Sequence, residues 1–336
     1  MSNKTVLVTD YTWPTTDPEA RVLEAVGAEL LIAETGEEAE LVELVKQADG
    51  ILTCFSHVTS DVIRAGANAR LQVVGRYGIG VDNIDVEEAT KCGIPVTYVP
   101  AYCLDEVTEQ CLAFLLASAR SICTYNSAVR EGDWNLSRGT PIFRVRGKTL
   151  GILGFGKIGS TLAAKASGLG LRIIAYDPFE DLIKADPAGI ESVSLEDLLA
   201  QSDYVSIHAP LIPQTRGLIN EERLRLMKPT AFLINAARGA IIDMDDLARA
   251  LRENWIAGAA LDVFEPERLP ADHPLLACPN LIATPHTAFY SEESVVDLEI
   301  LAAENVAAIL SGFRPASIVN PEVLELDRWS HLKTRE

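Results

Sequence analysis

The chain has 336 residues, of which 48% are hydrophobic and 23% charged, and its formal net charge is −19. This acidity argues against a nucleic-acid partner, and it means that an anionic substrate needs local positive charge in its binding cleft. No apolar run approaches the roughly 18 residues of a membrane helix, so no membrane partner is expected. The first residues have no signal-peptide pattern, so the expected location is the cytoplasm.

Six cysteines are distributed along the chain. They form no CxxC pair and do not combine with histidines at the spacing of a zinc site. We therefore predict reduced, mostly buried thiols and no metal site.

In the first hundred residues, short apolar runs alternate with helix-like segments, which is the rhythm of a parallel β-sheet with crossover helices. The apolar runs predict strands at 5–9, 29–33, 50–54, 71–75 and 95–99. Helices are predicted between them, for example at 37–47 and 86–92. One long helix is predicted from about residue 105 to residue 130.

A second series of the same kind follows. Its apolar runs predict strands at 149–154, 172–177, 204–209, 231–236, 257–263 and 281–286. The segment 291–312 has helical spacing and is expected to return, with the tail, to the first domain. The sequence thus predicts an α/β protein with two doubly wound parallel-sheet domains, formed by residues 1–101 with 291–336 and by residues 102–290. A ligand cleft is expected between the domains.

The second series opens with a glycine pattern that is typical of dinucleotide binding. Gly154, Gly156 and Gly159 form a GxGxxG sequence directly after a predicted strand and at the start of a helix. They would allow a tight turn, the approach of a pyrophosphate, and close packing of helix on strand. Asp177 ends the next strand and would accept hydrogen bonds from the ribose hydroxyls. Because a 2′-phosphate would meet this carboxylate, we expect NAD(H) rather than NADP(H).

Three later strands end in polar side chains. Arg238 follows the first, Asp262 lies at the end of the second, and His286 ends the third. Because ligands bind at the carboxyl ends of parallel strands, these groups could converge beside the nicotinamide. Glu265 and Glu267 follow in the loop after Asp262, and spacing alone does not choose between them.

This set of residues fits hydride transfer to a 2-oxo acid. Hydride adds to C2 and a proton must reach the forming alkoxide, for which a histidine such as His286 is the natural donor near neutral pH. A neighbouring carboxylate would orient the ring and favour its charged form. Arg238 can hold a substrate carboxylate through two parallel hydrogen bonds and polarise the carbonyl. The alternative for Arg238 is an ordinary solvated surface charge.

Several stretches are distinctive beyond these single residues. They are VVGRYGIGVDNID (73–85), GKTLGILGFGKIG (147–159), HAPLIPQTRGLIN (208–220), MKPTAFLINAARGAIID (227–243), GAALDVFEPE (258–267) and TPHTAFYSEES (284–294). Together they resemble the D-isomer-specific 2-hydroxyacid dehydrogenase family over nearly the whole chain. The runs VPAYCLDEVTEQ (99–110) and PHTAFYSEES are most similar to the branch of dehydrogenases that resemble C-terminal-binding-protein corepressors.

The resemblance implies a flavodoxin-like substrate domain and a Rossmann NAD-binding domain, and usually a homodimer formed through the cofactor domains. It implies a catalytic set of Arg238, Glu267 and His286, and so favours Glu267 over Glu265. Asp262 matches an aspartate that contacts the nicotinamide amide. The full implied cofactor-binding set is Gly154, Gly156, Lys157, Ile158, Gly159, Asp177, His208, Ala209, Pro210, Thr215, Ala236, Ala237 and Asp262.

Substrate contacts are implied at Arg76, Tyr77 and Gly78 of the first domain, partly through backbone amides. Phe289 stands where the corepressors carry a tryptophan, so their aromatic contact is altered. The stretch 53–63 lacks the phosphate-binding arginine that phosphoglycerate dehydrogenases often carry, and their common regulatory tail is not seen. Both points argue against phosphoglycerate as the substrate.

The predicted function is therefore NAD(H)-dependent interconversion of a 2-oxo acid and the D-2-hydroxy acid. The alternative is an NAD(H)-sensing scaffold similar to the corepressors, in which catalysis is secondary. Oxidation of formate or phosphite, which related folds perform, is disfavoured because none of the site motifs departs towards those branches.

Overall fold

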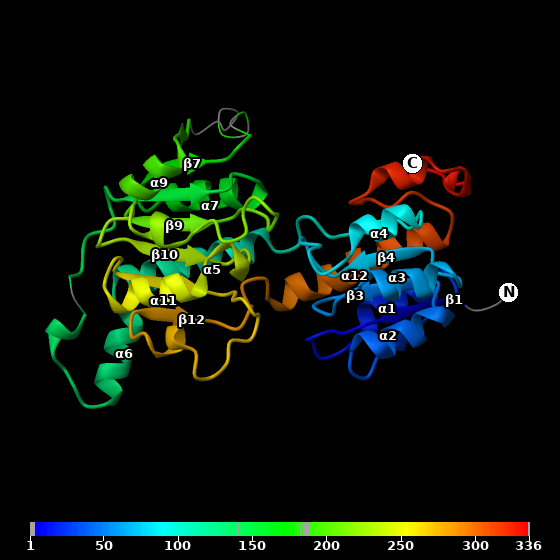
Figure 1. The fold of residues 1–336 in the computed structure, drawn as a ribbon, viewed down its shortest axis with the longest axis horizontal. Helices are drawn as coiled ribbons and strands as arrows, with labels where there is room; N and C mark the ends of the chain where they lie inside the picture. Colours follow the sequence, from blue (N-terminus) through cyan, green and yellow to red (C-terminus); the bar gives the residue numbers. More distant parts are fainter. Residues whose placement is uncertain (1–3, 140, 180, 182, 184–188, 335–336) are drawn as a thin grey trace. The chain divides into compact units, whose positions relative to one another are not determined.

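The computed structural model describes residues 4–139, 141–179, 181, 183 and 189–334. The chain divides into two units (Figure 1). Unit 1 is Met1–Tyr102 with Ser291–Glu336, and unit 2 is Cys103–Tyr290. Each unit is built around one parallel β-sheet, as the predicted α/β fold class requires.

The sheet of unit 1 has five described strands in the order β2-β1-β3-β4-β5, all parallel. They are β1 (Lys4–Val8), β2 (Ala28–Ile32), β3 (Gly50–Thr53), β4 (Val73–Arg76) and β5 (Val96–Thr97). This is the strand order of a flavodoxin-like doubly wound sheet. Each of the five strands overlaps a strand predicted from the apolar runs.

Helices flank this sheet. Those of unit 1 are α1 (Asp17–Glu24), α2 (Glu38–Leu44), α3 (Ser60–Ala67), α4 (Val86–Lys91) and α12 (Glu292–Leu310). The side chains of Ser291 and Ser294 form a capping box that begins α12. Helix α12 packs on α1, β3 and β4, so closely that a Cβ on Gly75 would lie 2.6 Å from Cγ2 of Val306. Helix α12 belongs to unit 1, the unit to which the sequence analysis expected it to return.

The tail after α12 continues along unit 1 through two short 3₁₀ helices, η5 (Pro321–Glu325) and η6 (Asp327–Trp329). Asn320 accepts a hydrogen bond from the backbone nitrogen of Val96 at 2.8 Å and donates to the carbonyl of Ile94 at 3.0 Å. Trp329 is buried and its Nε1 donates to the carbonyl of Gly93 at 2.9 Å. These bonds fasten the tail beside β5.

The sheet of unit 2 has seven described strands in the order β12-β11-β10-β9-β6-β7-β8, again all parallel. They are β6 (Thr149–Leu153), β7 (Arg172–Tyr176), β8 (Glu191–Ser192), β9 (Tyr204–Ile207), β10 (Phe232–Asn235), β11 (Gly258–Leu261) and β12 (Leu281–Ala283). This is the doubly wound Rossmann order with one further strand, and the strand order reverses between β6 and β9. Strand β8 was not predicted, because this two-residue edge strand has no apolar run.

The described α-helices of unit 2 are α5 (Leu104–Ala119), α6 (Ile122–Arg130), α7 (Lys157–Ser167), α9 (Leu195–Gln201), α10 (Glu221–Leu224) and α11 (Met244–Arg252). The prediction of one long helix from 105 to 130 is wrong. Ser121 has a φ of +50°, a left-handed conformation that cannot continue a right-handed helix, so α5 ends and α6 begins there. Helix α5 packs on α7, β10 and β11, whereas α6 carries exposed apolar side chains.

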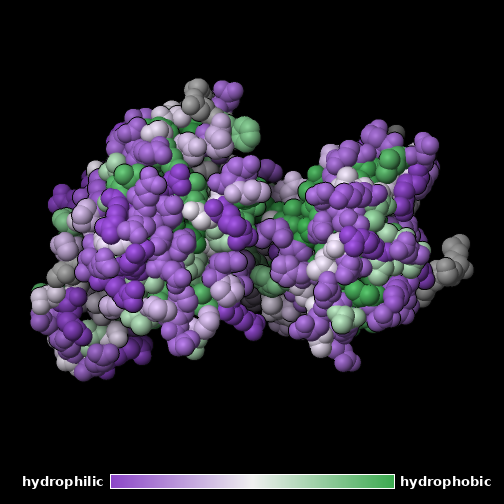
Figure 2. Space-filling model, in the orientation of Figure 1, coloured by the Kyte–Doolittle hydropathy of each residue, from purple (hydrophilic) through white to green (hydrophobic). Residues whose placement is uncertain are grey.

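Hydrophilic residues cover most of the face shown in Figure 2 on both units, in keeping with the high net charge. Within the described ranges, the structure contains no helix with the length and apolar character needed to cross a membrane.

Candidate active site

The turn after β6 has the geometry that a dinucleotide site requires. Gly154 has a φ of +93°, and a Cβ there would lie 2.6 Å from the backbone nitrogen of Ala209. A Cβ on Gly159 would lie 2.3 Å from the carbonyl oxygen of Gly154, so α7 packs directly on the turn. These packing roles were predicted and are confirmed. Gly156 is exposed, and nothing lies within 4 Å of a Cβ built on it, so the helix N-terminus is open to a ligand.

Asp177 follows β7 and holds the glycine turn from the side. Its Oδ2 accepts a hydrogen bond from the backbone nitrogen of Phe155 at 2.7 Å, and its Oδ1 accepts one from that of Phe179 at 2.9 Å. The side chain is only 9% exposed. A carboxylate oxygen can accept more than one hydrogen bond, so the predicted contact with ribose hydroxyls stays compatible with this arrangement. Lys157 and Ile158 form the first turn of α7 beside it.

The loop after β9 is ordered by its own polar side chains. His208 Nε2 lies 2.8 Å from the hydroxyl of Ser206, and burial lowers the pKa of His208 to about 4. The Thr215 hydroxyl donates to the carbonyl of Pro210 at 2.6 Å and accepts from the nitrogen of Ile212 at 2.9 Å. Because burial lowers its pKa to about 4, His208 is neutral near pH 7. Sequence reasoning singled out His208 and missed Ser206, a polar residue within an otherwise apolar strand.

We expect His208→Gln to make folding less sensitive to acid. The unfolded chain binds this proton from about pH 6.5 downwards, and the folded chain binds it only near pH 4. Stability contributed by the neutral ring is therefore lost as the pH falls through this window. Thermal unfolding should show a smaller fall in Tm between about pH 7 and pH 4.5 for the variant than for wild type. Exposed His57 provides the control His57→Gln, and equal falls in Tm for all three proteins would contradict the assignment.

The ends of β10, β11 and β12 are joined in register by backbone hydrogen bonds. The nitrogen of Asp262 donates to the carbonyl of Asn235 at 2.9 Å, and the nitrogen of His286 donates to the carbonyl of Asp262 at 2.8 Å. The segments that carry Arg238, Asp262 and His286 therefore leave the sheet side by side. The convergence of three strand ends expected from the sequence is present within unit 2.

Asn235 shapes the turn that carries Arg238. It is fully buried, its Oδ1 accepts from the nitrogen of Ala237 at 2.9 Å, and its Nδ2 donates to the carbonyl of Arg238 at 2.9 Å. A Cβ on Gly239 would lie 2.0 Å from the carbonyl carbon of Phe264, so this turn packs on the loop after β11. Arg238 is partly buried rather than fully solvated, and its Nη1 donates to the carbonyl of Ala237 at 2.8 Å. Sequence reasoning missed Asn235, whose only signal is a polar residue that ends an apolar strand.

Glu267 and His286 form a direct side-chain pair. Oε1 of Glu267 lies 2.5 Å from Nδ1 of His286, and the histidine side chain is 23% exposed against 48% for the glutamate. His286 has a φ of +56°, a left-handed conformation that is uncommon for a residue other than glycine. Glu265 instead lies 3.7 Å from Arg216. The geometry thus pairs Glu267, and not Glu265, with the histidine.

Phe289 lies beside the same histidine. The ring centroids of His286 and Phe289 are 6.2 Å apart, and the rings meet edge to face. The aromatic residue predicted as a substrate contact therefore borders the His286 ring.

Asp262 anchors the loop that carries His286. The side chain is 0% exposed, and its carboxylate accepts hydrogen bonds from the hydroxyl of Thr284, from the nitrogen of Thr287 at 3.0 Å and from the nitrogen of Ala288 at 2.8 Å. These donors lie on both sides of His286. The contact of Asp262 with the nicotinamide amide, which the resemblance implies, stays a prediction. Thr284 was not among the predicted site residues.

Asp262→Asn is expected to destabilise the protein by about 1–3 kcal/mol, because one oxygen becomes an NH₂ group that faces buried donors. The loop around His286 loses its anchor in this variant, so kcat should fall more than the affinity for NADH. Chemical denaturation and steady-state kinetics measure the two effects. Asp272→Asn, in an exposed loop of the same unit, is the matched control. A variant as stable and active as this control would show that Asp262 is not an anchor.

The predicted substrate residues of unit 1 lie at the end of β4, where all three are buried. Nε of Arg76 donates to Oδ1 of Asn83 at 3.1 Å, and its Nη1 donates to the carbonyl of Tyr77. A Cβ on Gly78, whose φ is +148°, would lie 3.0 Å from Nη1 of Arg76. Arg76 thus folds back on the loop that it begins, and its contact with a substrate stays a prediction.

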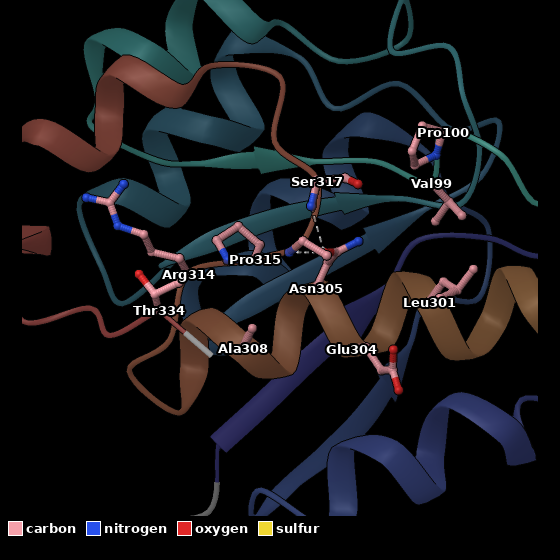
Figure 3. Close-up of a pocket in the computed structure, with 11 residues that line it drawn as sticks. Val99, Pro100, Leu301, Glu304, Asn305, Ala308, Arg314, Pro315, Ser317 and Thr334 are labelled. Atoms are coloured by element: carbon pink, nitrogen blue, oxygen red, sulfur yellow. Dashed lines mark hydrogen bonds between the residues drawn. The ribbon is translucent and has the colours of Figure 1, made fainter. Parts of the chain in front are cut away.

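A hollow of about 340 Å³ also lies in unit 1, between α12 and the tail (Figure 3). Its buried polar side chain, Asn305, accepts from the backbone nitrogens of Ala316 and Ser317 and donates to the carbonyl of Tyr98. The side chains of Arg314 and Glu304 point away from each other. This arrangement fastens the tail and brings no set of polar groups together.

The described residues contain no group of three or more histidine, cysteine, aspartate or glutamate side chains that could hold a metal ion. Four of the six cysteines are buried and none forms a disulfide. Burial raises the pKa of the Cys111 thiol to about 12, so this thiol stays protonated.

Comparison with known proteins agrees with this geometry. Residues 112–288 match the family model for the D-isomer-specific 2-hydroxyacid dehydrogenase NAD-binding domain. The chain is 41% identical over 292 residues to a glyoxylate reductase of Korarchaeum cryptofilum, covering 85% of this chain and 87% of the relative. It is 38% identical to a D-3-phosphoglycerate dehydrogenase of Methanocaldococcus jannaschii, over 98% of this chain and 62% of the relative.

A solved structure of a glyoxylate reductase from Paecilomyes thermophila superimposes with a TM-score of 0.83 at 27% identity, covering 96% of this chain and 100% of that one. The fold, the glycine turn and these matches together define an NAD(H)-dependent oxidoreductase. The chain belongs to the D-isomer-specific 2-hydroxyacid dehydrogenase family. The similarity to the corepressor branch in particular stays a prediction.

Proposed function

We propose that this enzyme reduces a small 2-oxo acid to the D-2-hydroxy acid with NADH, and catalyses the reverse oxidation, through Arg238, Glu267 and His286. The observation that carries the proposal is the 2.5 Å pair of Glu267 and His286 on the loops that follow β11 and β12, next to the turn that bears Arg238. Residues from three adjacent strand ends thus supply a cation, an acid and a carboxylate that orients the acid.

The residues around the glycine turn fit a dinucleotide. Gly156 leaves the N-terminus of α7 open, and the cofactor contacts that we propose include Asp177, the loop from His208 to Thr215, and the turn Ala236–Ala237. When bound, NADH supplies the hydride that the substrate carbonyl receives. Because burial keeps His208 neutral, this residue adds no positive charge to the cofactor site near pH 7.

Each residue of the catalytic set has a distinct part. His286 gives its proton to the oxygen that becomes the hydroxyl group. Glu267 holds the ring through Nδ1, so that Nε2 faces the substrate. Arg238 binds the substrate carboxylate and polarises the carbonyl group. Arg76, Tyr77, Gly78 and Phe289 contribute the remaining substrate contacts in this proposal.

The direct test is oxidation of NADH with glyoxylate, hydroxypyruvate, pyruvate and bulkier 2-oxo acids. Glyoxylate is the first candidate because several relatives about 40% identical are glyoxylate reductases. Phosphohydroxypyruvate is included because a relative is a phosphoglycerate dehydrogenase, and the absence of an arginine in 53–63 predicts poor turnover of it. No turnover of any of these acids would refute the proposal.

Asp177→Ser is expected to shift cofactor preference from NADH towards NADPH. The carboxylate would repel a 2′-phosphate and bind ribose hydroxyls, and serine does neither as strongly. We expect the ratio of kcat/KM for NADH to that for NADPH to fall by about tenfold or more, since one charge-assisted hydrogen bond is worth roughly 1.5–3 kcal/mol. Asp181, an exposed residue a few positions later in the chain, provides the control Asp181→Ser. An unchanged ratio would show that Asp177 does not contact the ribose of the cofactor.

We further propose that the enzyme is a cytoplasmic homodimer formed through unit 2. Trp134 is 79% exposed and Leu136 83% exposed, and both lie just after α6, whose Ile122 is also exposed. Large apolar side chains that are exposed within one short segment of the chain are what an interaction surface would cover. Light scattering should give twice the chain mass, and Trp134→Asp with Leu136→Asp should lower it towards the monomer value.

A further inference from the structure

Two acidic side chains are buried against each other in unit 1, and the proposed mechanism does not use them. Glu19 of α1 is 0% exposed and Glu299 of α12 is 2% exposed. The helices that carry them pack directly on each other. Burial of a charged carboxylate is costly unless it is paired with a donor. The buried pair of Glu19 and Glu299 must therefore be stabilised by donors or by a proton.

The donor on one side of the pair is Tyr77. Its hydroxyl donates to Oε1 of Glu19 at 2.9 Å, and its ring is 1% exposed. Trp13 packs against this ring edge to face, with the centroids 5.0 Å apart. The side chain of Tyr77 thus reaches from the end of β4 to α1 and is held there by packing and by one hydrogen bond to a carboxylate.

The two carboxyl groups share one proton. Burial, a hydrogen bond to Glu19 and the negative charge of Glu19 raise the pKa of Glu299 to about 9. With a proton on Glu299, the two carboxyl groups can lie next to each other and together carry a single negative charge. Oε2 of Glu19, Oε1 of Glu299 and Nε1 of Trp13 make no hydrogen bond of ordinary geometry, although Trp13 is near enough to Glu299 to oppose part of the rise in its pKa. Protonated Glu299 can donate to Glu19, and this keeps Glu19 available as the acceptor for Tyr77.

The backbone on either side of Tyr77 is fixed as well. Its nitrogen donates to the carbonyl of Thr53 at 2.8 Å, and the carbonyl of Gly78 accepts from the nitrogen of Val99 at 3.0 Å. Because the Tyr77 nitrogen is used within the fold, the backbone amide proposed here as a substrate contact is that of Gly78. The hydrogen bond of the Tyr77 hydroxyl to Glu19 adds a constraint from the side-chain end on the residue that precedes this amide.

We propose that Glu19 and Glu299 are positioning residues that hold Tyr77, and through it the amide of the following residue, Gly78, in the orientation that contacts the 2-oxo acid. This inference rests on the proposed function, because it assigns a role to groups outside the strand-end set. Neither glutamate touches the substrate; both act through the Tyr77 hydroxyl.

Tyr77→Phe tests this role by removing the hydroxyl and keeping the ring. We expect KM for the 2-oxo acid to rise about tenfold, the equivalent of one hydrogen bond to a charged group. The value of kcat and the Kd for NADH should stay within about twofold, because the strand-end set is untouched. Tyr11→Phe is the matched control, since Tyr11 also lies against Trp13, with ring centroids 6.0 Å apart.

The pH dependence of KM provides a second readout. The charged or titratable groups around Glu299 are Glu19 and Asp17 on α1 and Tyr77 after β4, and Cys54 after β3 acts on Tyr77. Burial raises the pKa of Tyr77 well above its usual value, so Tyr77 does not titrate before Glu299. Wild-type KM should therefore rise above about pH 9, where Glu299 loses the proton. Glu299→Gln keeps a permanent donor to Glu19 and should abolish this rise.

The outcomes separate this inference from the proposed function. If wild type reduces no 2-oxo acid, the proposed function fails and this inference fails with it. If wild type is active and Tyr77→Phe has the KM of Tyr11→Phe, only the positioning role is overturned. Equal losses in kcat, KM and NADH affinity would also overturn it, because they indicate a general structural defect. An identical rise of KM with pH in wild type and Glu299→Gln would exclude the shared proton as its cause.

Discussion

Replacement of His286 by alanine is expected to lower kcat for reduction of the 2-oxo acid by about 100- to 10,000-fold, the usual contribution of a general acid. The physical reason is that no other described group is paired with Glu267 to deliver a proton to the forming alkoxide. The affinity for NADH should change little, since the His286 side chain is not among the proposed cofactor contacts. Stopped-flow or steady-state measurement of NADH oxidation gives kcat, and fluorescence titration gives the cofactor affinity.

The exposed His57 of unit 1 supplies the control for this experiment, and His57→Ala should keep wild-type kcat. Glu267→Gln preserves the shape of the partner and removes its charge, so its kcat should fall between those of wild type and His286→Ala. If His286→Ala retained wild-type kcat with every 2-oxo acid in the panel, the catalytic set would be wrong. Equal kcat for Glu267→Gln and wild type would remove only the glutamate from it.

Arg238→Lys should lower kcat/KM for the 2-oxo acid by about 100- to 1,000-fold, comparable to the loss of one donor that stabilises developing charge. Lysine keeps the positive charge but cannot present two parallel N–H groups to a carboxylate. It also loses the bond from Nη1 to the carbonyl of Ala237 that holds the side chain beside the strand ends. The measurement is kcat/KM across the substrate panel, with NADH binding measured separately.

Arg216→Lys is the matched control for this substitution. Arg216 lies in the same unit, its side chain is 59% exposed, and it pairs with Glu265 at 3.7 Å. Its replacement should leave kcat/KM within about twofold, because exposed ion pairs contribute little. If kcat/KM for Arg238→Lys equalled that for Arg216→Lys, Arg238 would be an ordinary surface charge and not a substrate contact.

The parallel sheets could be predicted because buried parallel strands are nearly continuous apolar runs. Every predicted strand overlaps an observed one, and TLGILG (149–154) and AFLINA (231–236) differ from β6 and β10 only at their ends. The errors fall where no apolar signal exists. Strand β8 (Glu191–Ser192) has only two residues, and the break at Ser121 depends on a left-handed backbone conformation within a helical pattern.

The glycine turn and the polar strand ends are local features, and for that reason the sequence identified them. Gly154, Gly156 and Gly159 act through their own missing side chains, and Arg238 and His286 follow strands that are easily recognised. The groups that sequence reasoning missed are single polar residues whose hydrogen-bond partners the sequence does not mark. Asn235 holds a turn through two hydrogen bonds, and Thr284 donates to a carboxylate that lies 22 positions earlier in the chain.

By itself, then, the sequence determined the fold class, the dinucleotide turn and the chemical types at the strand ends, since each depends on residues close together in the chain. The tertiary structure placed against His286 the glutamate that the family resemblance implied, a choice that spacing alone had left open. Only the tertiary structure decided that Asp262 anchors the histidine loop and that Tyr77 reaches a buried acid pair formed by Glu19 and Glu299. These contacts join residues from different elements. Their existence depends on how helices and strands pack, which spacing along the chain does not specify.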